Sequence, residues 1–172
     1  DAEMQKLFAR WGQEKPTFES VLERELKSFG PTRRQTHFKV VKRLIDAAQT
    51  GDPMELVTAV HEPITSEFEM LKEQFAKIGV PEDKQGKAVN DFWLWERNCD
   101  LPHHRLTAYL FAAFARRAAH GQKKITRGLM NDVVSIATYA HYVDAMFLDQ
   151  QCADLLAEQP LAKDLKYKAR IF

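Results

Sequence analysis

The sequence has few of the features that mark secreted or membrane-bound proteins. Only two of its 172 residues are cysteines, Cys99 and Cys152, and they lie in unrelated contexts, so the sequence suggests neither a disulfide framework nor a zinc pattern. No apolar run approaches the roughly 18–20 residues of a membrane-spanning helix. No segment has the basic start and short apolar stretch of a signal peptide. We therefore expect a cytoplasmic protein with no membrane partner.

The sequence also lacks an excess of charge of either sign. The formal net charge is +1, which gives the chain as a whole no attraction to nucleic acid. Basic residues are nevertheless concentrated in two stretches, each of which is either a solvated helix face or a nucleic-acid-binding surface. The first stretch holds Arg33, Arg34, Lys39, Lys42 and Arg43, and the second holds Arg116, Arg117, Lys123, Lys124 and Arg127.

Helical periodicity dominates what is present. Apolar residues recur at helical spacing from Met4 to Trp11, and Phe29-Gly30-Pro31 predicts a break between two later helices. Asp52-Pro53 is typical of a helix start, because Asp caps and proline fits the first turn. The predicted helices span about residues 4–11, 17–29, 32–48, 53–78 with a division at Pro63, 82–95, 103–120, 131–139 and 150–158.

The pattern changes after His141. Residues 142–149 are apolar in the middle and bounded by acids, which predicts a buried strand over Val143–Leu148. A helical continuation has the same periodicity and stays open. Lys168–Phe172 predicts a second strand, and the intervening helix favours a parallel, right-handed crossover. The expected fold is therefore a helix-dominated α/β fold in a single domain, residues 1–172.

The chain begins at Asp1 and stops in an apolar, extended-looking ending at Phe172. A strand cut off there would leave an unpaired edge. We therefore expect the sequence to be part of a longer polypeptide.

Two acids occupy the positions best suited to chemistry. Asp132 is predicted at a helix N-terminus, and Asp149 follows the predicted strand, 17 residues later. Ligand sites of open α/β sheets gather at the carboxyl ends of strands. Two carboxylates held together repel unless a cation lies between them, and oxygen ligands suit Mg²⁺ or Mn²⁺. The open alternative is that both acids only cap helices.

The stretch NDVVSIATYAHYVDAMFLDQQCADLL (131–156), followed by KARIF (168–172), resembles the C-terminal half of PIN-like proteins. The preceding LPHHRLTAYLFAAFARRAAHGQKK (101–124) and TRGLMND (126–132) resemble the helix and loop that lead into this motif in a bacterial PIN-like subgroup. The resemblance covers residues 92–172 and leaves 1–91 as a helical elaboration. It implies an α/β/α sandwich and a ribonuclease dependent on Mg²⁺ or Mn²⁺.

On that resemblance, Asp132 and Asp149 match the third and fourth acids of the family and would be catalytic metal ligands. Asp144 is either a supporting ligand or a strand-end charge, and Glu96 is a candidate for the middle acid at an unusual spacing. No segment matches the strand that carries the family's first acid, so that strand lies outside this sequence or the protein is a relative that does not cut. The substrate would be single-stranded RNA, held by Lys123, Lys124 and Arg127.

Two other functions stay open. Arg97-Asn98-Cys99-Asp100-Leu101-Pro102-His103 resembles the short motif of HEPN-type ribonucleases, in which Arg and His act without a metal. Alternatively, the chain is a non-catalytic module whose N-terminal helices bind a protein partner and whose acids are structural.

Overall fold

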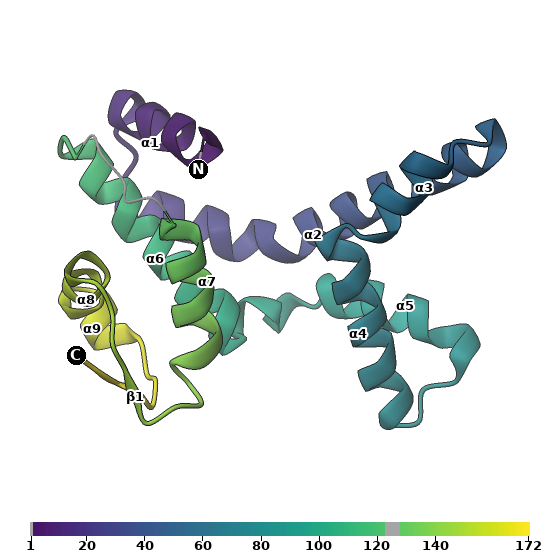
Figure 1. The fold of residues 1–172 in the computed structure, drawn as a ribbon. Helices are drawn as coiled ribbons and strands as arrows, with labels where there is room; N and C mark the ends of the chain where they lie inside the picture. Colours follow the sequence, from purple (N-terminus) through teal and green to yellow (C-terminus); the bar gives the residue numbers. More distant parts are fainter. Residues whose placement is uncertain (1, 123–127) are drawn as a thin grey trace. The chain divides into compact units, whose positions relative to one another are not determined.

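A computed structural model describes residues 2–122 and 128–172 of the chain (Figure 1). The fold of these residues is helix-dominated, with one small parallel sheet of two strands. The elements are α1 (Ala2–Glu14), α2 (Phe18–Thr50), α3 (Pro53–Val60), α4 (Pro63–Lys77), α5 (Glu82–Trp93), the 3₁₀ helix η1 (Glu96–Asp100), α6 (Pro102–Ala119), α7 (Leu129–Tyr139), β1 (Ala145–Met146), α8 (Gln150–Ala157), α9 (Leu161–Asp164) and β2 (Arg170–Ile171).

The chain divides into two compact units. Unit 1 holds the described residues of 1–27 and 99–172, and unit 2 holds residues 28–98. Because α1 packs against α6, the N-terminal helix belongs to the same unit as the C-terminal helices. Within the described part of the chain, no helix has both the length and the apolar character to cross a membrane.

Unit 1 is built around α6. This helix packs against α1, α7 and α8, and it buries Leu106, Leu110 and Phe114 completely. From α1, Phe8 and Trp11 contribute aromatic rings to the same core, with the Phe8 and Phe114 ring centroids 5.9 Å apart. The helix predicted over residues 103–120 is confirmed.

The predicted parallel pairing of the two strands is confirmed. β1 pairs with β2 in a register that sets Ala145 beside Arg170 and Met146 beside Ile171. The amide of Arg170 donates to the Asp144 carbonyl at 3.0 Å. The described residues thus form a two-stranded sheet rather than the larger sheet of an α/β/α sandwich.

The predicted burial of Val143–Leu148 is wrong. Val143, Met146 and Leu148 are only partly buried against the core of unit 1, and Phe147 is 86% exposed. The physical reason is that a buried parallel strand needs cover on both faces, whereas this short sheet contacts the core with one face only. On the other face the rings of Phe147 and Phe172 stack, with centroids 5.5 Å apart.

The predicted break at Phe29-Gly30-Pro31 is also wrong, because α2 runs through Pro31 as one helix of 33 residues. Proline in a helix removes one hydrogen bond and crowds the preceding turn, which is why the local pattern predicts a stop. Tertiary contact overrides that preference here. A Cβ atom on Gly30 would lie 1.7 Å from the Trp93 carbonyl oxygen, so glycine allows α2 and the end of α5 to touch.

Unit 2 packs α3, α4 and α5 around residues 28–50 of α2. Its small core consists of Val40, Ala59, Ile64, Val89 and Trp93. The predicted starts of α3, α4 and α5, and the division at Pro63, are confirmed.

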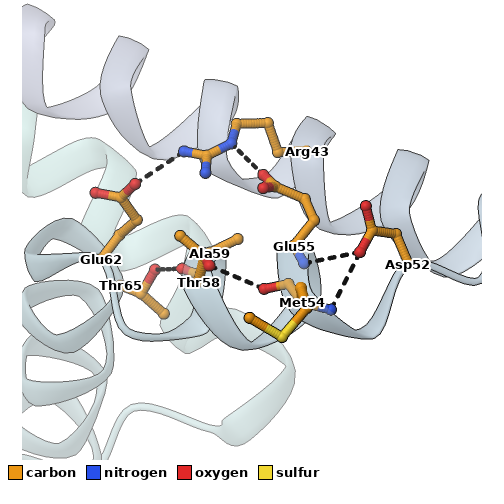
Figure 2. A network of polar contacts seen from close by, with 8 residues as sticks. All are labelled: Arg43, Asp52, Met54, Glu55, Thr58, Ala59, Glu62 and Thr65. Atoms are coloured by element: carbon orange, nitrogen blue, oxygen red, sulfur yellow. Dashed lines mark hydrogen bonds and ion pairs between the residues drawn. The ribbon is translucent and has the colours of Figure 1, made fainter.

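Polar contacts fix α3 and the start of α4 beside α2 (Figure 2). Arg43 of α2 reaches Glu55 at 2.5 Å and Glu62 at 2.8 Å, so one guanidinium holds two carboxylates. The predicted Asp52 cap is present, since its carboxylate accepts from the amides of Met54 and Glu55 at 3.1 Å each (Figure 2). Capping and ion pairing therefore reinforce the same short helix.

Candidate functional site

Asp132 is carried by the first turn of α7. The helix begins at Leu129, two residues before the predicted start, because Gly128 adopts φ +93° and supplies the N-terminal cap position. Such a conformation favours glycine. Asp132 is consequently not the N-cap of α7, and its half-buried carboxylate is available for other contacts.

Asp149 is the N-cap of α8, three residues beyond β1. Its Oδ1 atom accepts a hydrogen bond from the Cys152 amide at 2.7 Å, which fixes the orientation of the carboxylate. The capping role considered for Asp149 from the sequence is therefore confirmed. A carboxylate has two oxygens and can accept several bonds, so capping leaves it free to take a second partner.

The fold brings Asp132, Asp149 and Cys152 together. One carboxylate oxygen from each acid and the Cys152 Sγ atom all lie within 4.8 Å of one another. The two acids are close in space although 17 residues separate them, because residues 140–148 return the chain from the end of α7 to the start of α8. Sequence reasoning missed Cys152, whose signal is its position three residues after a helix-capping acid.

Burial and mutual repulsion disfavour negative charge on the side chains of this group. Burial raises the pKa of Asp132, and the charge of Asp149 raises it further. Burial also raises the pKa of the Cys152 thiol to about 12, helped by its hydrogen bond to Asp149 and by the two nearby carboxylates. Cys152 therefore stays protonated at neutral pH, and a cation beside Asp132 and Asp149 would relieve the repulsion between them.

Among the described residues, Asp144 and Glu96, the other predicted metal ligands, are not part of this group. Asp144 is 90% exposed and pairs with Lys168 at 2.8 Å, which lowers its pKa, so the alternative of a strand-end charge fits it. Glu96 lies in η1 and belongs to unit 2. Lys123, Lys124 and Arg127 lie outside the described residues.

The residues of the HEPN-like motif are divided between the two units. Arg97 lies in η1 and belongs to unit 2, with its guanidinium carbon 5.7 Å from the Trp95 ring centroid. His103 lies in the first turn of α6 in unit 1, with its ring centroid 5.8 Å from that of His104. Arg97 lies near the ring of Trp95, and His103 lies near the ring of His104.

Comparisons of the chain with models of protein families, with curated proteins and with solved structures found no match. The resemblance to PIN-like proteins thus stays an expectation from the sequence. A functional assignment rests on the residues of this chain, above all on Asp132, Asp149 and Cys152.

Proposed function

We propose that Asp132 and Asp149 bind one Mg²⁺ or Mn²⁺ ion and that the protein uses it to hydrolyse single-stranded RNA, in a reaction of the PIN-like type. The observation that carries the proposal is the convergence of the two carboxylates, with oxygens within 4.8 Å of each other. Divalent ions at phosphodiester sites are commonly held by one or two carboxylates, with water and phosphate oxygens as the remaining ligands.

The donor atoms suit a hard cation better than a soft one. Asp132 and Asp149 supply oxygens, whereas a thiol with a pKa of about 12 supplies no thiolate at neutral pH. Cys152 instead positions Asp149, because its amide donates to the Asp149 carboxylate at 2.7 Å and its thiol bonds to the same side chain. The two acids fit the proposed ion, and Cys152 fits the role of a positioning residue.

Each side chain has a definite task in the proposed reaction. A bound divalent ion would lower the pKa of water and would place positive charge beside the phosphate. Asp132 and Asp149 would supply one oxygen each, and the capping bond from the Cys152 amide fixes the Asp149 carboxylate. Lys123, Lys124 and Arg127, which precede α7 in the sequence, offset the repulsion between the acids and RNA.

Cleavage of labelled single-stranded RNA in Mn²⁺ tests this function. We expect cutting that stops with excess chelator and in both Asp132→Asn and Asp149→Asn, with Asp144→Asn as the matched acid that keeps activity. Replacing Lys123, Lys124 and Arg127 by glutamine should weaken binding to all sequences and flatten its salt dependence. Cutting that persists in chelator and ends with His103→Ala would instead identify the metal-free HEPN-type reaction.

A second candidate is a protein-interaction module, and α3 is the observation that favours it. This helix buries Ala59 but leaves Met54, Val57 and Val60 at least half exposed. Large apolar side chains gathered on one short helix are typical of a surface that binds another protein. The N-terminal helices would then carry the function, and the acids of unit 1 would be structural.

Site-specific photocrosslinking distinguishes this module from a simple exposed helix. A crosslinker at Val57 should give one discrete adduct in extracts of the native host, and a crosslinker at the exposed Lys42 of α2 should give none. Equal or absent crosslinking at the two positions would contradict an interaction through α3.

A further inference from the structure

His37 is the buried ionisable group at the centre of unit 2. It lies on α2, and only 8% of its surface is exposed. Its ring stacks on Phe68 of α4 with centroids 3.9 Å apart and an angle of 15° between the planes. The Trp93 ring of α5 meets it edge-on at 5.6 Å. One imidazole thus touches both helices that pack on this part of α2.

Protonation of His37 would place a charge and an unsatisfied donor in this aromatic site. Its Nδ1 atom is buried and has no hydrogen-bond partner within the described residues. In the imidazolium form both ring nitrogens carry hydrogens, so Nδ1 would become a donor without an acceptor. The face of Phe68 attracts a cation, but a desolvated charge and a lost hydrogen bond to water oppose that attraction.

The charged groups around His37 are largely engaged with other partners. On α4, Glu69 pairs with Lys72 at 2.9 Å, and the Lys72 amino group lies 5.9 Å from the Phe68 ring centroid. Arg33 of α2 pairs with Glu67 of α4 at 2.5 Å. Arg34, also on α2, lies over the Phe38 ring, with its guanidinium carbon 5.1 Å from the ring centroid.

Burial is the dominant influence on the His37 ring, and it lowers the pKa of His37 below the ordinary 6.5, with the charge of Glu69 acting in the opposite direction. Between the lowered folded pKa and the ordinary 6.5, His37 is therefore protonated in the unfolded chain and neutral in the folded unit. It follows that the free energy of unfolding falls as pH drops below about 6.5 and continues to fall until the folded form also protonates.

We propose that His37 makes unit 2 an acid-sensitive module, in which protonation of this one imidazole loosens α4 and α5 from α2. The stacking of His37 on Phe68 of α4 and its edge-on contact with Trp93 of α5 are among the contacts that join the three helices. Phe68 and Trp93 also lie near each other, with centroids 5.8 Å apart, so a shift of the imidazole disturbs both. The proposal rests on residues of unit 2 alone and does not involve Asp132 or Asp149 of unit 1.

The test combines an NMR titration of the His37 ring with urea unfolding at pH 7.5 and pH 5.0. In the unmodified protein we expect His37 to titrate below pH 6.5 and the urea midpoint to fall at pH 5.0. His37→Phe keeps an aromatic ring that cannot protonate, so most of this fall should disappear. Amide exchange should show protection lost in α4 and α5 but kept in α6, which belongs to unit 1.

The exposed His61 provides the matched control, because it is a histidine of the same unit with a solvent-exposed side chain. His61→Gln should keep the full pH difference. Burial raises the pKa of Glu67, so Glu67 stabilises the folded unit as pH falls and opposes the effect of His37. The change in the pH difference on His37→Phe therefore measures the contribution of His37 itself. Titration of His37 at or above pH 6.5 would overturn the proposal, and that measurement needs no variant to fold.

Discussion

Asp132 carries an unfavourable charge while no cation is bound. Its pKa is raised first by burial and second by Asp149, so the folded state disfavours the ionised form. The unfolded carboxyl ionises near its ordinary pKa of 3.8. The free energy of unfolding therefore falls as pH rises through that value to the raised folded pKa, and it stays reduced at neutral pH.

Asp132→Asn should accordingly stabilise the metal-free protein at pH 7. An ionised acid in the first turn of a helix gains about 0.3–1 kcal/mol from the helix dipole, so we expect a net rise within about 1 kcal/mol. The difference should vanish at pH 3, where both states carry a protonated acid. Urea unfolding at the two pH values measures it.

Asp144→Asn is the control for that measurement. The Lys168 partner lowers the pKa of Asp144, so its removal should give no stabilisation at pH 7. A loss of stability in Asp132→Asn at pH 7 would mean that the repulsion with Asp149 is negligible in the folded protein.

The two thiols should differ strongly in reactivity. Burial and the adjacent carboxylates raise the pKa of Cys152 from the ordinary 9.0 to about 12. Because the thiolate is the reacting species, alkylation of Cys152 at pH 8 should be at least about 100-fold slower than that of a free thiol. Cys99 is only half-buried and should react first.

Mass spectrometry after timed iodoacetamide treatment identifies the modified cysteine. Cys152 should become reactive in urea, when burial and the Asp149 contact are lost. Equal rates for Cys99 and Cys152 in the folded protein would contradict the arrangement of Asp132, Asp149 and Cys152.

At the scale of elements, α2 shows how far local sequence signals reach. Gly30-Pro31 is a strong stop signal, and nothing in the surrounding sequence reveals that Trp93 approaches Gly30 from 63 positions away. The caps and prolines at Asp52, Pro63 and Pro81 act locally, and the helix boundaries they predict are correct. Sequence therefore predicts boundaries that depend on neighbouring residues and misses those decided by tertiary contact.

Gly30→Ala should destabilise unit 2 strongly. The new Cβ atom would lie 1.7 Å from the Trp93 carbonyl oxygen, so α2 and α5 must move apart. Overpacking of this kind costs about 1–3 kcal/mol or more. Urea unfolding followed through Trp93 and Trp95 fluorescence, in a protein with Trp11→Phe, reports on unit 2.

Gly86→Ala is the matched control within the same unit. Its Cβ would meet only the end of the Phe68 ring, at 3.7 Å, and alanine favours helix over glycine by about 0.5–1 kcal/mol. We expect unchanged or raised stability. Similar losses at Gly30 and Gly86 would show that the close approach of Trp93 to α2 is not a feature of the protein.

For the strands, the pairing predicted from the sequence is correct, and the predicted burial is wrong. The apolar content of Val143–Leu148 predicts burial, yet this content is divided between a half-buried face and the exposed ring of Phe147. Burial depends on how many elements cover a sheet, and a single strand's composition does not specify that number. The pairing partner was predictable because a helix of suitable length separates the two strands.

At the scale of the whole molecule, periodicity identified most helices but not their grouping. The apolar face of α1 is evident from Met4, Phe8 and Trp11, whereas its packing against α6 requires contacts across about a hundred residues. The proximity of Asp132 and Asp149 was predictable because it follows from one helix and one returning segment. The place of Cys152 follows from the capping geometry of Asp149, which the residue types alone do not give.

The most direct test of the account is a calorimetric titration of the protein with Mn²⁺. Because one carboxylate oxygen from each of Asp132 and Asp149 lies within 4.8 Å of the other, we predict one Mn²⁺ per chain. Binding should be lost in Asp132→Asn and in Asp149→Asn, where asparagine still caps α8, and retained in Asp144→Asn. Absence of Mn²⁺ binding, or binding unaltered by both changes, would contradict the account and leave these acids as structural residues.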